Sequence, residues 1–236
     1  MGSILGKNIK ISLFGESHGK AIGVNIDGLP PGIEVNMDNI RQELARRSPG
    51  KDRLSTERRE ADEFEILSGY FQDRTTGAPL CAIIRNEDIR PVDYDKTKDL
   101  MRPSHADYSG HIKYHGYNDY RGGGHFSGRL TAPLVFAGAI AREILNKEEI
   151  YIASHIKSIG HIEDLPFEYV NIKIDTIKYL NRSEFPVLDK PKGKVMKDLI
   201  IQAREDRDSV GGIIETAGTE NSSFARLASR PSKKGA

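Results

Sequence analysis

The chain has 236 residues, and its 35 lysines and arginines are balanced by 34 aspartates and glutamates, which leaves a formal net charge of +1. This balance argues against a dedicated nucleic-acid-binding surface, because such domains are usually basic. The single cysteine excludes an internal disulfide framework and fits a reducing compartment. The longest apolar stretch, residues 130–141, contains a proline and is too short to cross a bilayer, and no signal peptide is evident, so we expect a cytoplasmic protein without membrane contact.

The first third of the chain alternates apolar and polar residues, at positions 9–13 and again at positions 22–26. Alternation of this kind is typical of antiparallel strands with one buried and one exposed face. Asn36 is a candidate N-cap for a helix that reaches about Arg47, and the Ser-Pro-Gly sequence that follows predicts its end. A nearly continuous apolar run at residues 77–85 predicts a further strand.

Residues 90–121 show little periodicity, and a long irregular stretch inside a compact domain is commonly a functional loop. A helix that is apolar around most of its circumference is predicted over residues 127–146, and it should be buried centrally. Further along the chain we expect strands at residues 150–159, 167–174 and 213–215, and an amphipathic helix at residues 190–207. Residues 217–236 are small, polar and finally basic, so we expect a disordered tail that leaves the strand at 213–215 with an unpaired edge.

A glycine loop, Gly122 to Gly124, precedes the apolar helix. Without a Cβ the backbone can approach a flat or anionic ligand closely. Ser127 stands at the N-cap position, where free N–H groups and the helix dipole favour an anion or the polar edge of a flavin. The alternative interpretation is a plain flexible loop before a helix.

Arginines are concentrated in fourteen residues, at positions 46, 47, 53, 58 and 59. Arginine binds phosphate and carboxylate in a bidentate manner. Neighbouring acidic residues could instead neutralise several of them on a solvated face, so we expect at most two to be functional.

Two histidines are candidates for proton transfer near neutral pH, although a structural role is the alternative for each. His18 follows the first strand in the sequence Glu-Ser-His-Gly, and His105 lies between Arg102 and Asp107. We expect structural roles for four others, which are His111, His115, His155 and His161. No pair has convincing ligand spacing, so no metal site is expected.

Six motifs in order resemble those of the chorismate synthase family. They are Gly15-Glu-Ser-His-Gly19, Asp27-Gly-Leu-Pro-Pro-Gly32, the arginine loop from Arg46 to Asp62, Arg102-Pro-Ser-His-Ala-Asp-Tyr108, Asp119-Tyr-Arg-Gly-Gly-Gly124 and Asp208-Ser-Val-Gly-Gly212. After the triple glycine, many members have Arg-Ser-Ser-Ala-Arg-Glu-Thr, so Ser127 and Arg129 align while His125 replaces an arginine. Family members are longer and have a C-terminal part that the tail of this chain does not resemble, so we expect a truncated or frame-shifted chain.

The resemblance implies an α+β fold, a β-α-β sandwich in which antiparallel sheets enclose central helices. Residues 1–216 would be the N-terminal part of a single catalytic domain, and residues 217–236 a non-matching tail. The family eliminates phosphate from 5-enolpyruvylshikimate 3-phosphate (EPSP) in an anti-1,4 sense to give chorismate, a lyase reaction of the shikimate pathway that makes aromatic amino acids. The reaction needs reduced FMN, which some members regenerate with NADPH, and members assemble as homotetramers.

By the same resemblance, His18 would donate a proton toward the departing phosphate, and His105 would stabilise the charge of the reduced flavin. The implied substrate-binding residues are Arg47, Arg53 and Arg129, and the implied FMN-binding residues are Ser17, His125, Phe126 and Ser127. The alternative is a non-catalytic remnant that at most binds anions or flavin weakly. A small RNA-binding module is excluded by the net charge and by the absence of an aromatic stacking motif.

Overall fold

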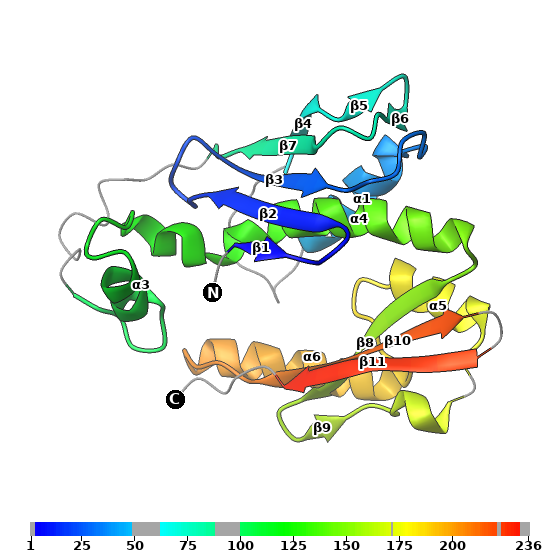
Figure 1. The fold of residues 1–236 in the computed structure, drawn as a ribbon. Coiled ribbons are helices and arrows are strands. Elements are labelled where there is room, and N and C mark those ends of the chain that lie inside the picture. The colour runs from blue at the N-terminus through cyan, green and yellow to red at the C-terminus, as the bar shows by residue number, and fades with distance from the viewer. Residues whose placement is uncertain (1–2, 49–61, 88–99, 171, 221–222, 232–236) are drawn as a thin grey trace. The chain divides into compact units, whose positions relative to one another are not determined.

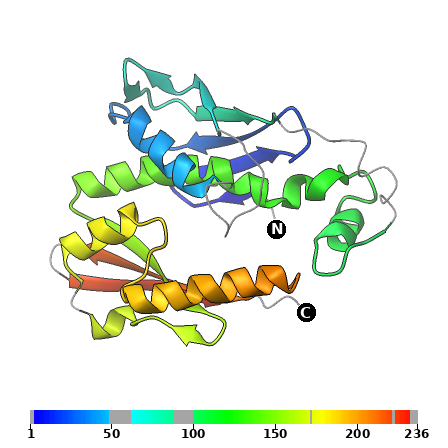
Figure 2. The same ribbon diagram turned by 180° about the vertical axis from the view of Figure 1, so that it is seen from behind.

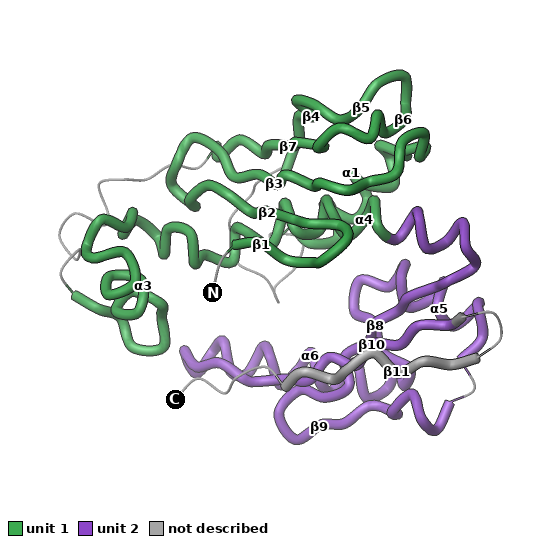
Figure 3. Tube along the Cα trace, viewed as in Figure 1, with its two compact units in different colours: residues 1–50, 57–141 green, residues 51–56, 142–236 purple. Residues whose placement is uncertain are grey.

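The computed structural model describes residues 3–48, 62–87, 100–170, 172–220 and 223–231. Helices and antiparallel sheets form an α+β fold (Figure 1). The chain divides into two compact units, residues 1–50 with 57–141 and residues 51–56 with 142–236 (Figure 3). The sequence motifs singled out above fall mainly in the first unit.

The first unit contains a five-stranded sheet in which every pair of neighbours is antiparallel. In spatial order its strands are β1 (Ile4–Leu5), β2 (Lys10–Gly15), β3 (Ala21–Asp27), β7 (Leu80–Arg85) and β4 (Phe64–Ser68). The predicted alternation is confirmed in the central strand, where Ile22, Val24 and Ile26 are buried. A small ribbon of β5 (Tyr70–Phe71) and β6 (Arg74–Thr75) completes the strands of this unit in the described residues.

Two helices of the first unit, α1 (Met37–Arg47) and α4 (Thr131–Lys147), lie on the same face of this sheet (Figure 2). The Asn36 side chain accepts hydrogen bonds from the first turn of α1, which confirms the predicted cap. The rings of Phe64 and Phe136 meet edge to face at 5.1 Å and pack β4 against α4. The sequence predicted that α4 would be buried centrally, but this burial is not complete, because Leu134 on the helix is 38% exposed.

The stretch at residues 90–121 is less irregular than predicted, although residues 88–99 lie outside the described part. It contains the short helix α3 (Asp107–Lys113) and the start of a 3₁₀ segment, η1 (Arg121–Phe126), that holds the glycine loop. A second 3₁₀ turn, η2 (Gly128–Leu130), leads into α4. The Ser127 hydroxyl accepts the backbone N–H of Arg129 in η2, as an N-cap does.

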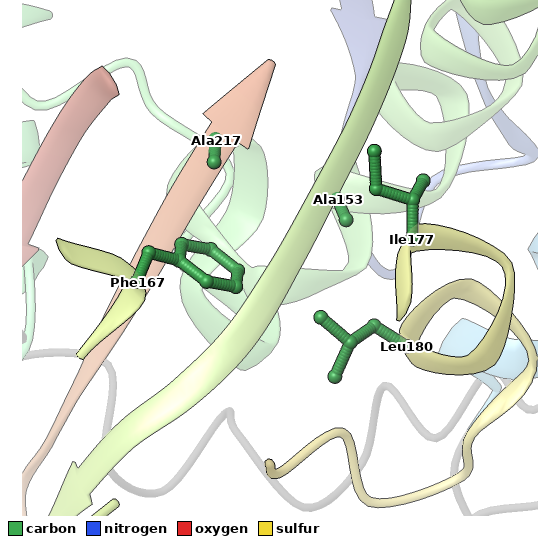
Figure 4. Close-up of a cluster of buried hydrophobic side chains, with 5 residues drawn as sticks. All are labelled: Ala153, Phe167, Ile177, Leu180 and Ala217. Atoms are coloured by element: carbon green, nitrogen blue, oxygen red, sulfur yellow. The ribbon is translucent and has the colours of Figure 1, made fainter. Parts of the chain in front are cut away.

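The second unit is a four-stranded antiparallel sheet with two helices on one of its faces (Figure 2). Its strands in spatial order are β11 (Ser223–Pro231), β10 (Gly212–Glu220), β8 (Tyr151–Ile159) and β9 (Ile162–Glu163), and its helices are α5 (Ile174–Arg182) and α6 (Lys190–Glu205). Phe167, Ile177 and Leu180 pack with alanines of β8 and β10 to form a hydrophobic core (Figure 4). The predicted strand at 150–159 and helix at 190–207 are confirmed.

Three expectations for the second unit are corrected. The described residues of the range 167–174 form no strand. A 3₁₀ turn, η3 (Phe167–Tyr169), precedes α5, in which Ile177 and Leu180 lie at helical spacing and are both buried. The edge at 213–215 is not open, since β10 pairs with β8 on one side and β11 on the other. The expectation of a disordered tail is therefore wrong for the part of residues 217–236 that belongs to β10 and β11.

Candidate active site

The turn between β2 and β3 carries Ser17 and His18, and both side chains are almost fully buried. The backbone N–H of Ser17 donates to the carbonyl of Gly124 at 3.2 Å, and its hydroxyl donates to the carbonyl of Arg121 at 3.3 Å. The first and fifth motifs therefore lie against each other, although more than a hundred residues separate them in the sequence.

The glycine loop has a defined conformation, with positive φ at Gly122, Gly123 and Gly124. A Cβ on Gly122 would lie 2.4 Å from two atoms of the His18 ring. A Cβ on Gly124 would lie 2.2 Å from the carbonyl oxygen of Asp119. Glycine is thus required by close packing on His18 as well as by backbone geometry, and this argues against a plain flexible loop.

An ion pair flanks this loop. The Asp119 carboxylate accepts the Arg121 Nε–H at 2.8 Å and an Arg121 Nη2–H at 2.6 Å. The Arg121 guanidinium holds the pKa of Asp119 below its usual range against the effect of burial, and the nearby His18 acts in the same direction. A negative charge is therefore maintained near the buried imidazole.

His125 joins the glycine loop to the edge of the sheet. Its Nδ1 lies 2.9 Å from the carbonyl oxygen of Gly15, and its Nε2 lies 2.7 Å from the hydroxyl of Ser3. Beside it the ring of Phe126 is 43% exposed, with the Tyr114 ring centroid 5.9 Å away. Together these side chains form part of the wall of a cavity of about 410 Å³.

The same cavity has apolar and polar walls. Phe14, Tyr114 and Phe126 contribute aromatic rings, while Glu16 and Asp119 contribute carboxylates. Such a cavity suits a planar ring with a polar edge.

Asp62 is the centre of a cluster of charged side chains. Its carboxylate, which is fully buried, accepts hydrogen bonds from Arg47 and from Arg129. The Ser48 hydroxyl donates to the same carboxylate at 3.0 Å. Two arginines from separate segments are therefore held by one acidic residue, and Asp62 is one of the neighbouring acids that the sequence offered as partners for the arginines. The third predicted arginine, Arg53, lies outside the described residues.

Asn86, immediately after β7, connects this cluster to the His18 turn. Its Oδ1 accepts the Arg129 Nε–H at 3.1 Å. Its Nδ2 donates to the carbonyls of Glu16 and Gly19, each at 2.9 Å. The sequence did not indicate this residue, because an asparagine at a strand end carries no signal by itself.

His105 lies apart from these contacts. It is exposed, its Nδ1 lies 3.0 Å from the carbonyl oxygen of Pro103, and its described hydrogen bonds remain within its own segment. Arg102 binds the Asp107 carboxylate through two guanidinium nitrogens and lowers the pKa of that carboxyl. The structure thus connects Ser17, His18, Arg47, Arg129, His125 and Ser127 through hydrogen bonds and shared segments, but not His105.

The second unit holds a buried triad of His155, Asp164 and Glu215, whose contacts the sequence did not indicate. Nδ1 of His155 lies 3.0 Å from Asp164, and its Nε2 lies 3.1 Å from Glu215. Each nitrogen of the buried imidazole therefore faces a carboxyl group. The same carboxylates accept backbone N–H groups of Phe167, Leu188 and Asp189, which identifies the triad as structural.

Comparison with known proteins identifies the family. The sequence model for chorismate synthase matches residues 9–223. The chain belongs to the chorismate synthase family. This confirms the resemblance drawn from the motifs, and the match extends beyond residue 216, where the motif resemblance ends.

Two curated relatives named chorismate synthase show how much of that family the chain represents. The protein from Thermococcus kodakarensis is 45% identical over 210 residues, which are 89% of this chain and 57% of the relative. The protein from Dehalococcoides mccartyi is 43% identical over 218 residues, which are 92% of this chain and 59% of the relative. The chain therefore spans less than two thirds of the length of these chorismate synthases.

A solved structure described as "Crystal Structure of Chorismate Synthase" superposes on the chain with a TM-score of 0.68 and 28% sequence identity, over 90% of this chain and 57% of that one. The predicted α+β fold of the family is thereby confirmed. In the described residues no helix has the length and apolarity needed to span a membrane.

Proposed function

We propose that residues 1–216 are the N-terminal part of a chorismate synthase catalytic domain, a lyase that eliminates phosphate from EPSP to give chorismate. The observation that carries the proposal is the continuous set of hydrogen bonds from the turn that carries the buried His18, through Asn86, to the arginines bound at Asp62. A proton donor and cationic side chains are both needed to expel a phosphate.

The arginine cluster supports an anionic substrate. Arg47 and Arg129 share the single carboxylate of Asp62, so the group keeps an excess of positive charge. EPSP carries a phosphate and two carboxylates, which guanidinium groups bind in a bidentate manner. Arg53 would add a third cation. His18 would donate the proton toward the departing phosphate.

The residues around the cavity fit FMN, judged by the aromatic side chains in its walls and by the polar residues beside them. His125 and Phe126 would hold the flavin from the cavity wall, and Ser17 and Ser127 from the turn and the helix start. Bound reduced FMN would supply the electronic step that the side chains cannot. His105 would contribute positive charge beside the flavin, and NADPH would serve as reductant in the manner of some members. We further propose a homotetramer in the cytoplasm.

The test is an anaerobic assay with EPSP and chemically reduced FMN, with chorismate measured by chromatography. Two preparations are compared: the 236-residue chain, and a fusion that appends the unmatched C-terminal length of the Thermococcus kodakarensis relative. The proposal is supported if either preparation forms chorismate with reduced FMN but not with oxidised FMN. No turnover in either preparation, with or without flavin binding, would contradict the proposal and support the non-catalytic alternative.

A further inference from the structure

Both the nitrogen and the oxygen of the Asn86 side-chain amide are hydrogen-bonded. The amide has two N–H donors, and they meet two carbonyl oxygens, those of Glu16 and Gly19. Its oxygen meets Nε of Arg129. The residue is only 7% exposed, so solvent offers little replacement for these hydrogen bonds.

The position of Asn86 at the end of a central strand fixes it relative to the sheet. It directly follows β7, which lies between β3 and β4 in the sheet. Its backbone N–H donates to the carbonyl of Lys20 at 3.2 Å, so both its main chain and its side chain hold the segment between β2 and β3. The two carbonyls that it binds bracket Ser17 and His18.

On the other side of Asn86, Arg129 is fixed by several groups. It contacts the Asp62 carboxylate and donates to the carbonyl of Arg85 at 3.4 Å. Asp62 in turn holds Arg47. One amide thus lies between the segment that carries the imidazole and the segment that carries the guanidinium groups.

We propose that Asn86 is a positioning residue that fixes the His18 turn relative to Arg129. The proposal rests on the proposed function, in which His18 donates a proton and Arg129 binds the anionic substrate. Only an amide of this length supplies two donors and one acceptor at this point. Asparagine is therefore required even though it is not itself assigned a contact with the substrate.

Asn86→Ala tests the proposal. In whichever preparation turns over EPSP, kcat should fall about 10- to 100-fold while the protein stays folded, because a misplacement of about 1 Å can have an effect of this size. Formamide, which carries the deleted donors and acceptor, should partly restore kcat, whereas formate, which lacks the donors, should not. Asn146→Ala, at an exposed position on α4, is the matched control and should keep the parent kcat.

A second measurement does not depend on activity. In ¹⁵N NMR spectra of the 236-residue chain, the Arg129 Nε–H should be protected from solvent exchange, and Asn86→Ala should remove that protection. If Asn86→Ala does not fold, Asn86→Ser replaces it in both measurements. Unchanged exchange at Arg129, or a folded variant with kcat within twofold of the parent, would overturn the proposal. Failure of both parent preparations to form chorismate would contradict the proposed function alone.

Discussion

His18 is buried against Gly122 and near the charged Asp119, whereas His105 is exposed on the segment before α3. We expect His18→Ala and His105→Ala each to lower turnover by about 10²- to 10⁴-fold, the usual contribution of a positioned proton donor or acceptor. Steady-state kinetics, with thermal melting to verify folding, gives the measurement. His111→Ala, an exposed change on α3, serves as control, and full turnover in both test variants would refute the assigned roles.

Gly122 offers a sharper test of the loop. Its φ is +62° and a Cβ would lie 2.4 Å from the His18 ring, so Gly122→Ala should strain the backbone and displace the imidazole. We expect a loss of about 1–3 kcal/mol in the free energy of unfolding, together with reduced turnover. Gly128→Ala is the matched control, because no atom lies within 4 Å of its added Cβ. Equal effects of the two changes in urea unfolding would argue against close packing at Gly122.

Arg47 and Arg41 lie on the same helix in different environments. Arg47 binds the buried Asp62, whereas Arg41 pairs with Asp38 at the surface. Arg47→Ala should weaken EPSP binding by roughly 1.5–3 kcal/mol, the range for a hydrogen bond to a charged group. Arg41→Ala should leave binding almost unchanged, since surface ion pairs contribute little. Calorimetric titration with EPSP measures both, and equally small losses would indicate that the arginine loop is only a solvated face.

At the scale of single elements, the sequence predicts the helices and strands whose patterns involve only neighbouring residues. The strand patterns at residues 9–13 and 22–26 and the Asn36 cap each involve residues that are close in sequence, and the strands β2 and β3 and the cap of α1 are confirmed. Helix α5 was missed because the apolar residues from Phe167 onward also fit a strand until tertiary packing selects the helical face.

Contacts between distant segments could not be predicted from one sequence. The motifs located His18, Arg47 and Arg129, but their connection through Asp62 and Asn86 depends on how β7 lies beside β3. The triad around His155 likewise joins residues of β8 and β10 that are sixty positions apart. Pairings of this kind arise from the sheet register, which no local pattern encodes.

The contacts of Glu215 on β10 predict how the stability of the second unit depends on pH. Burial disfavours the charged form of Glu215, but hydrogen bonds from the Phe167 backbone N–H and from His155 outweigh it, so its pKa lies below the ordinary 4.5. A carboxyl with a lowered folded-state pKa stabilises the fold above its unfolded value. That stabilisation should be lost as the pH falls from about 4.5 through the folded-state pKa.

Hydrogen exchange of the Phe167 amide between pH 3 and 6, corrected for intrinsic rates, measures this effect. Protection should decrease below the ordinary pKa of glutamate, and Glu215→Gln should flatten the dependence. Glu184→Gln, at an exposed position before α6, is the control and should retain the slope. An identical pH dependence in the parent and Glu215→Gln would contradict the role assigned to the triad.

At the scale of the whole molecule, the matched region spans 57% of the Thermococcus kodakarensis relative. Leu134 on α4 and Ile214 on β10 are among the exposed apolar side chains. We expect the 236-residue polypeptide to bind FMN weakly, to show little chorismate formation and to self-associate, because exposed apolar surface favours association. The fusion with the remaining length of that relative should be more active and less associated.

Light scattering coupled to gel filtration, run on both preparations beside the chorismate assay, checks this expectation. Equal activity and equal monodispersity of the two would show that the added length contributes nothing to either property.

The contact between His125 and Ser3 has a practical consequence for producing the protein. Ser3 lines the cavity and is hydrogen-bonded to the histidine of the glycine loop. An affinity tag fused ahead of Met1 would therefore begin two residues from Ser3 in the sequence, where a polyhistidine run would compete with the flavin proposed for this cavity. Tags for binding studies are better placed after the last residue of the chain.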